Sequence, residues 1–172
     1  MFDGPYLAAC LLLVAAGLAK TMRPEDTARA LGDLLGRRPG LRLARLVVRL
    51  LAALEAAVGA AGFLHPGGVG LVVAGSYAVF TGVVLYARRR GGPLSTCGCF
   101  GRADTPATRT HAVLTAALAA FAVGASLTGP PDLAQLVAHQ PLDGVPMLLT
   151  AAGIAAVAWM AMTLLATLRG AP

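Results

Sequence analysis

The residues best suited to chemistry are two cysteines separated by one glycine, within segment 88–111, RRRGGPLSTCGCFGRADTPATRTH. Cys97 and Cys99 are two of only three cysteines in the chain. Closely spaced thiols serve two chemistries, metal binding and disulfide exchange. A structural zinc ion needs four ligands. Nearby, only His111 and Asp104 would add to the two thiols, in a spacing that matches no common zinc signature. Metal binding is therefore the weaker interpretation, and we assign no metal ligand.

The surroundings of the pair favour disulfide exchange. Gly98 gives the backbone the freedom that a small Cys-Gly-Cys ring requires. Strain in such a ring makes the disulfide easier to reduce than a structural one. The arginines at 88–90 and Arg102 create a positive field that favours the thiolate, which is the form that attacks a disulfide. The pattern predicts a redox pair at Cys97 and Cys99, with inert loop thiols in a reducing compartment as the open alternative.

The composition places this pair in a membrane protein. The chain has 172 residues, of which 57% are hydrophobic and 13% charged, and its mean hydropathy is +0.73. A soluble domain would carry about a quarter charged residues. The apolar residues form blocks long enough to span a bilayer. We therefore expect an all-α polytopic transmembrane helix bundle, a single domain over residues 1–172, with five spans at about 5–20, 43–64, 69–88, 109–128 and 145–168.

The basic residues predict how the bundle is oriented. All fourteen lysines and arginines lie in segments 20–49 and 88–109 or at Arg169. With five spans these positions share one face, and the positive-inside rule makes that face cytoplasmic. The pattern reports topology and does not indicate a nucleic-acid partner. We expect a multi-pass protein of the cell inner (cytoplasmic) membrane, surrounded by lipid bilayer. Its N-terminus lies outside, and its C-terminus and cysteine loop lie in the cytoplasm.

A short helix is predicted after the first span, at about 24–36. Pro24 suits the first turn of a helix, and Glu25 and Asp26 lie at the positive end of its dipole. Pro39 stops the helix, and its leucines share one face. We expect an interfacial amphipathic helix lying on anionic headgroups, with a flexible basic loop as the alternative.

Glu55 is the acidic residue placed deepest in a predicted span. Counting from residue 43, it lies about 18 Å along the helix, near the middle of a core about 30 Å thick. A carboxylate at this depth should face the bundle and be either protonated or paired. Tyr77 and Thr81 are the partners expected at a similar depth. Proton handling, quinone binding and a structural hydrogen bond that fixes packing all remain open for Glu55.

Three further residues have simpler expected roles. Lys20 ends the first span, where snorkelling towards the headgroups explains it. Cys10 is expected to be a small packing residue of the first span, since it lies too deep to join the other thiols. Thr108 is expected to cap the fourth span, with His111 in its first turn.

Three stretches of the chain together resemble a known family. LLLVAAGLAK, LLAALEAAVGAAGFL and CGCFG are similar to the methylamine-utilisation protein MauE family, within the wider DoxX-like set of small membrane proteins. The resemblance covers about residues 5–165. It carries over the motif Cys97, Gly98, Cys99, Phe100 and Gly101, and the charged positions Lys20 and Glu55. It implies support for maturation of the disulfide-rich small subunit of methylamine dehydrogenase, alongside a thioredoxin-like partner.

These observations lead to one main hypothesis and two alternatives. The main hypothesis is a component of a thiol–disulfide oxidoreductase system that uses Cys97 and Cys99, supported by Glu55, Lys20 and His111. Such a system is compatible with a quinone cofactor, although no residue of the sequence clearly implies a cofactor. The alternatives are a non-catalytic membrane scaffold or chaperone, and a small transporter or metal-binding membrane protein.

Overall fold

The protein is a bundle of helices. The computed structural model describes residues 3–35, 41–90, 108–129 and 141–168. Every element in these ranges is a helix, and five of the helices are long and apolar enough to cross a membrane. The predicted all-α polytopic bundle is therefore confirmed. The helices are α1 (Asp3–Met22), α2 (Pro24–Leu35), α3 (Leu41–Leu64), α4 (Pro66–Arg90), α5 (Arg109–Thr128) and α7 (Pro141–Leu168).

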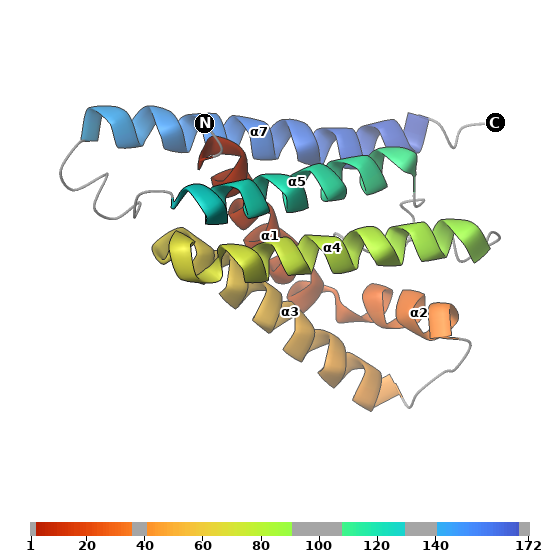
Figure 1. The fold of residues 1–172 in the computed structure, drawn as a ribbon. Helices are drawn as coiled ribbons and strands as arrows, with labels where there is room; N and C mark the ends of the chain where they lie inside the picture. Colours follow the sequence, from red (N-terminus) through yellow and green to blue (C-terminus); the bar gives the residue numbers. More distant parts are fainter. Residues whose placement is uncertain (1–2, 36–40, 91–107, 130–140, 169–172) are drawn as a thin grey trace.

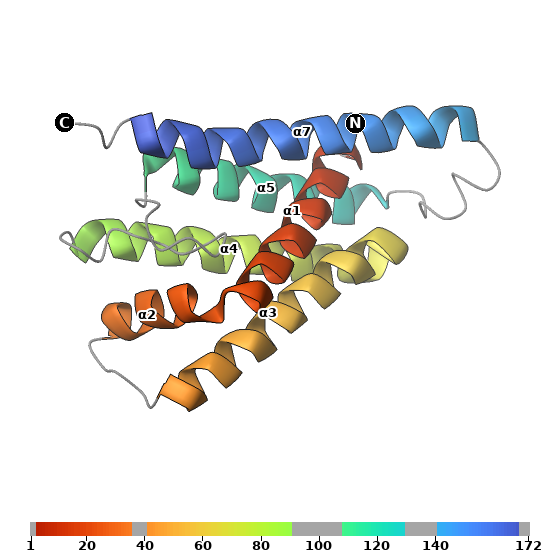
Figure 2. The same ribbon diagram turned by 180° about the vertical axis from the view of Figure 1, so that it is seen from behind.

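Helix α1 is the centre of the bundle. Helices α4, α5 and α7 run side by side, and α1 crosses them at an angle on the side where α3 also lies (Figures 1 and 2). More than half of the apolar stretch of α1 is buried, against at most a third in the other four spans. This helix packs on α3, α7 and α5. A span surrounded in this way can keep polar side chains away from lipid.

Close backbone packing joins α1 to α3. A Cβ atom added at Gly17 of α1 would lie 2.6 Å from the Ala52 carbonyl oxygen and 2.8 Å from the Ala56 nitrogen. A Cβ atom added at Gly59 of α3 would lie 2.7 Å from the Cys10 carbonyl oxygen. Small residues at such contacts let the backbones of membrane helices approach closely. The two glycines therefore set the distance and register of this pair of helices.

The outer faces of the spans are apolar. Large hydrophobic side chains are exposed along α3 and α4, among them Leu50, Leu54, Leu71 and Val79. A soluble protein would not show this much contiguous apolar surface, so these faces are compatible with a lipid bilayer. That the whole chain forms one domain stays a prediction.

The segment after the first span forms the helix α2, which begins at Pro24 as expected. Arg45 of α3 binds Glu25 at 2.8 Å, and Ala28 packs with Ala44 and Val48. These contacts hold α2 against the first part of α3.

Basic residues concentrate at one end of the described bundle. The end of α4, the start of α5 and the end of α7 lie together, and α2 extends towards the same side (Figure 1). Within the described helices, lysine and arginine occur only at the ends of α1 and α4, in α2, and near the starts of α3 and α5. We call the region of the end of α4, the start of α5 and the end of α7 the basic end. The end of α1, with Lys20, lies beside the middle of α4 instead (Figure 1).

Candidate functional site

A buried ion pair lies at the centre of the candidate site. Lys20 Nζ, two residues before the end of α1, donates to Glu55 Oε2 of α3 at 2.5 Å. The side chains of Lys20 and Glu55 are only 10% and 8% exposed. The expectation that Lys20 snorkels is therefore wrong, because its side chain turns into the bundle and neutralises a carboxylate there. Glu55 faces the bundle, as expected, and of the two alternatives left open by its depth, protonated or paired, the structure shows the pairing.

The packing of α1 on α3 explains why these two residues meet. Lys20 lies three residues after Gly17, and Glu55 lies three residues after Ala52. Residues three apart share one face of a helix. Gly17 sits against Ala52 and Ala56, and Glu55 lies between these two alanines in the chain. Because side chains of a helix lean towards its N-terminus, Lys20, one turn after Gly17, reaches back to Glu55. The contact that sets the helix register thus also sets the ion pair.

Phe80 of α4 covers the ion pair, and Tyr77 packs against Phe80. Lys20 Nζ lies 4.8 Å from the centre of the Phe80 ring, a distance at which a cation is attracted to the ring face. Phe80 meets Tyr77 edge to face, with ring centres 5.9 Å apart. The Tyr77 hydroxyl donates to the Ala9 carbonyl of α1 at 2.7 Å. Tyr77 is therefore not the partner of Glu55 that the sequence suggested, and it ties α4 to α1 instead.

Thr81 is also engaged elsewhere. Its hydroxyl lies 2.8 Å from the Tyr77 carbonyl oxygen and 2.9 Å from Thr115 Oγ1 of α5. Thr115 in turn donates to the His111 carbonyl at 2.8 Å. Both residues that the sequence proposed as partners of Glu55 therefore serve helix packing. The true partner is Lys20, 35 residues away in the chain.

His111 lies in the first turn of α5, as predicted. Thr108 is the N-cap, and its Oγ1 accepts from the His111 backbone nitrogen at 3.4 Å. The same oxygen lies 2.9 Å from His111 Nδ1. The imidazole is almost completely buried. His111 therefore links the start of α5 to the interior, although its role in any reaction stays a prediction.

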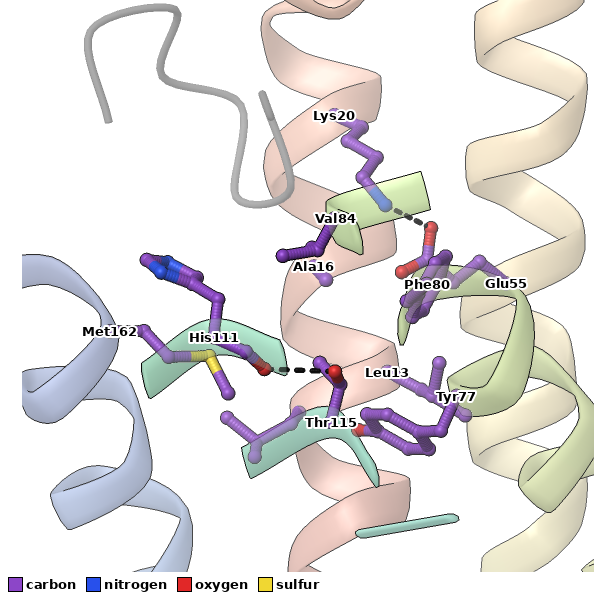
Figure 3. Close-up of a pocket in the computed structure, with 11 residues that line it drawn as sticks. Leu13, Ala16, Lys20, Glu55, Tyr77, Phe80, Val84, His111, Thr115 and Met162 are labelled. Carbon is purple, nitrogen blue, oxygen red and sulfur yellow. Dashed lines mark hydrogen bonds and ion pairs between the residues drawn. The ribbon is translucent and has the colours of Figure 1, made fainter. Parts of the chain in front are cut away.

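A small cavity lies between these residues. It measures about 30 Å³, and five of its lining residues are polar or titratable: Lys20, Glu55, Tyr77, His111 and Thr115. Figure 3 shows them arranged around the space, with apolar side chains of α1, α4 and α7 between them. Among the described residues, no hydrogen-bond partner reaches the buried Glu55 Oε1. Glu55 is thus one of the residues around the cavity, but apolar atoms form nearly all of the cavity wall.

The remaining predicted site residues divide between the described and undescribed parts of the chain. Cys10 is a fully buried free thiol in the core of α1, which agrees with a packing role. The motif Cys97, Gly98, Cys99, Phe100 and Gly101 lies outside the described residues. Its redox role therefore stays a prediction.

Sequence reasoning missed two residues of the site. Thr115 lies four residues after His111, so helical spacing alone would have placed both on one face of α5. Phe80 carried no comparable signal, because an aromatic residue in an apolar span is ordinary. Only the crossing of α1 and α4 shows that Phe80 covers Lys20.

The fold and the site together define a class of protein, a polytopic helical membrane protein with a charge pair buried in its bundle. The family model described as methylamine utilisation protein MauE matches residues 4–129, which run from α1 through α5. The chain belongs to the methylamine utilisation protein MauE family, as the resemblance implied. Membership implies a membrane protein of methylamine utilisation. No curated protein and no solved structure matches the chain.

Proposed function

We propose that this protein takes part in thiol–disulfide exchange at the membrane through Cys97 and Cys99, in support of the maturation of disulfide-containing proteins. The observation that carries the proposal is the Cys-Gly-Cys spacing in a member of the MauE family. The partner is a thioredoxin-like protein, and the setting is methylamine metabolism.

The exchange takes place in two thiolate attacks. The thiolate of one cysteine attacks the disulfide of the partner, which forms a mixed disulfide and releases one partner thiolate. The second cysteine then attacks the mixed disulfide, so that the partner leaves as a dithiol and a Cys97–Cys99 disulfide forms. Two electrons pass to the partner, and two protons move from the thiols of this chain to those of the partner. The reverse sequence oxidises the partner.

The described residues on either side of the cysteine segment in the chain support this proposal. The segment joins Arg90 at the end of α4 to Thr108 at the start of α5, and both helix ends lie at the basic end (Figure 1). Positive charge near a thiol favours the thiolate. Arg88, Arg89 and Arg109 are thus anchored on the helices that flank the pair.

We expect the pair to form a reversible disulfide. Purified protein alkylated under oxidising conditions should carry two fewer alkyl groups than reduced protein, as measured by mass spectrometry. The variant Cys10→Ala should show the same difference of two alkyl groups between the oxidised and the reduced sample, because Cys10 is fully buried and takes no part in the disulfide. The variant Cys97→Ser/Cys99→Ser should show no difference between the two conditions. Equal alkylation of Cys97 and Cys99 with and without reductant would contradict the proposal.

A trapping experiment separates exchange from scaffolding. We compare the single variants Cys97→Ser and Cys99→Ser. The variant that keeps the attacking cysteine and lacks the second one should accumulate a mixed disulfide with the thioredoxin-like partner, because the second attack is blocked. The double serine variant should trap none. If the double variant supports partner maturation as well as the wild type does, the protein acts as a scaffold and the exchange mechanism is wrong.

We further propose that the basic end faces the cytoplasm. A membrane-impermeant thiol reagent should leave Cys97 and Cys99 unlabelled in intact cells and label them after permeabilisation. The matched control is His65→Cys in a Cys10→Ala/Cys97→Ser/Cys99→Ser background, since exposed His65 lies between α3 and α4 at the opposite end. This site should be labelled in intact cells. Labelling of Cys97 and Cys99 from outside would reverse the orientation.

A further inference from the structure

The first half of α3 exposes two arginines beside a row of leucines. Arg42 and Arg49 are both exposed and lie seven residues apart, which is about two helical turns, so they share one stripe of the helix. We call these two residues the arginine stripe. Leu43, Leu46 and Leu50 are each more than half exposed, and such an apolar surface suits contact with lipid acyl chains. The arginine stripe therefore borders the apolar outer face of α3.

A third exposed arginine lies at the same level of the bundle. Cys10 of α1 lies opposite Gly59 of α3, and Gly17 lies opposite Ala52, so the two helices are antiparallel. Seven residues separate the members of each pair along their own helix, so the register is constant. Continued by six residues, it places exposed Arg23, directly after α1, level with the middle of the arginine stripe. The end of α1, α2 and the first half of α3 lie together (Figure 2).

The carboxylates of this region are already engaged with other basic residues. Glu25 and Asp26 of α2 bind Arg45 and Arg29, respectively. Glu55 is held in the buried ion pair. Among the described residues, no carboxylate pairs with the arginine stripe or with the arginine that follows α1. Three positive charges thus remain without a counter-charge on a surface that borders the apolar face.

The start of α3 adds to this positive potential. The N-terminus of a helix carries a partial positive charge, so a cation in the first turn is unfavourable. Arg42 is nevertheless the second residue of α3. An anion bound here would neutralise both the helix end and the arginines. A guanidinium group matches the geometry of a phosphate, to which it can donate two parallel hydrogen bonds.

We propose that Arg23, Arg42 and Arg49 bind the headgroup phosphate of an anionic phospholipid beside α2. The acyl chains of this lipid lie along the exposed leucines of α3, a contact that a soluble anion cannot make. A choline headgroup would bring a positive charge towards the arginines, so an anionic headgroup is preferred. The described charged side chains of α2 bind protein groups, and the lipid is therefore held mainly by α3. The site goes beyond thiol exchange and does not depend on it.

Native mass spectrometry of the full chain tests the proposal. The protein is released from nanodiscs that contain equal amounts of phosphatidylglycerol and phosphatidylcholine, and the retained lipids are counted. The wild type should retain phosphatidylglycerol in preference. Arg42→Gln and Arg49→Gln should each lower this preference about fivefold, and the double variant about 25-fold, because each basic residue contributes separately to the attraction. Both residues are exposed, so the variants should fold.

Arg29→Gln is the matched control. It removes the same charge from the neighbouring helix α2, where Asp26 already neutralises the arginine. This variant should change the lipid preference far less than Arg49→Gln does. An equal loss in the two variants would show that the lipid follows the overall charge and that the arginine stripe is not a site.

Three further results would overturn the proposal. One is equal retention of the two lipids by the wild type. Another is an unchanged preference for phosphatidylglycerol in Arg42→Gln/Arg49→Gln. The third is displacement of the bound phosphatidylglycerol by excess inorganic phosphate, which would assign this surface to a soluble anion and not to a lipid.

Discussion

Replacing Lys20 with methionine is expected to lower the free energy of unfolding by about 3–5 kcal/mol, because it leaves the carboxylate of Glu55 buried without its counter-charge. Methionine keeps most of the length of the side chain, so packing against α3 changes little. The Lys20–Glu55 contact is the one ion pair in the described structure with both side chains at least nine-tenths buried. Unfolding in mixed micelles, followed by circular dichroism, measures the effect.

The double variant Lys20→Met/Glu55→Leu separates the ion pair from packing. Removing both charges together should cost much less than removing Lys20 alone, because no unpaired charge remains. Asp26→Asn serves as a control, since its bond to the largely exposed Arg29 should contribute only about 0–1 kcal/mol. A Lys20→Met variant as stable as Asp26→Asn would mean that Glu55 is not charged in the folded bundle.

The second large effect is expected at the contact between α1 and α3. Gly17→Ala should lower the free energy of unfolding by about 1–3 kcal/mol, because a Cβ atom there meets backbone atoms of Ala52 and Ala56 that cannot rotate away. The two helices must move apart. Since Lys20 lies one turn after Gly17, and Glu55 is the neighbour of Ala56, their bond should lengthen as well.

Gly82→Ala is the matched control for this prediction. Gly82 lies inside α4, and a Cβ atom there would meet nothing within 4 Å. Alanine favours a helix over glycine, so this change should be neutral or stabilise the protein by about 0.4–1 kcal/mol. Both variants are measured by the same micelle titration. Equal stability of Gly17→Ala and Gly82→Ala would show that α1 and α3 are not closely packed.

Parts of the candidate site were predictable because they depend on local sequence. Thr108 precedes an apolar run and has a side chain that caps helices, so the start of α5 and the place of His111 followed directly. Glu55 was expected to face the bundle and to be either protonated or paired, because a charged carboxylate in mid-span is costly. Its partner was not predictable. Tyr77 and Thr81 have suitable groups at a suitable depth, but their hydroxyl groups are used for other contacts.

The sequence by itself determined the five spans, the short helix between the first two, and the gathering of basic residues at alternate helix ends. These properties follow from the length of apolar runs and from charges placed beside them, which need no knowledge of neighbouring helices. The tertiary structure alone decided that Lys20 turns inward to Glu55 under Phe80, with a cavity beside them. Helix rotation and register cause this arrangement. Rotation and register are set where Gly17 and Gly59 let the backbones of α1 and α3 touch. Such contacts join residues distant in the chain, so the sequence of either helix alone does not predict them.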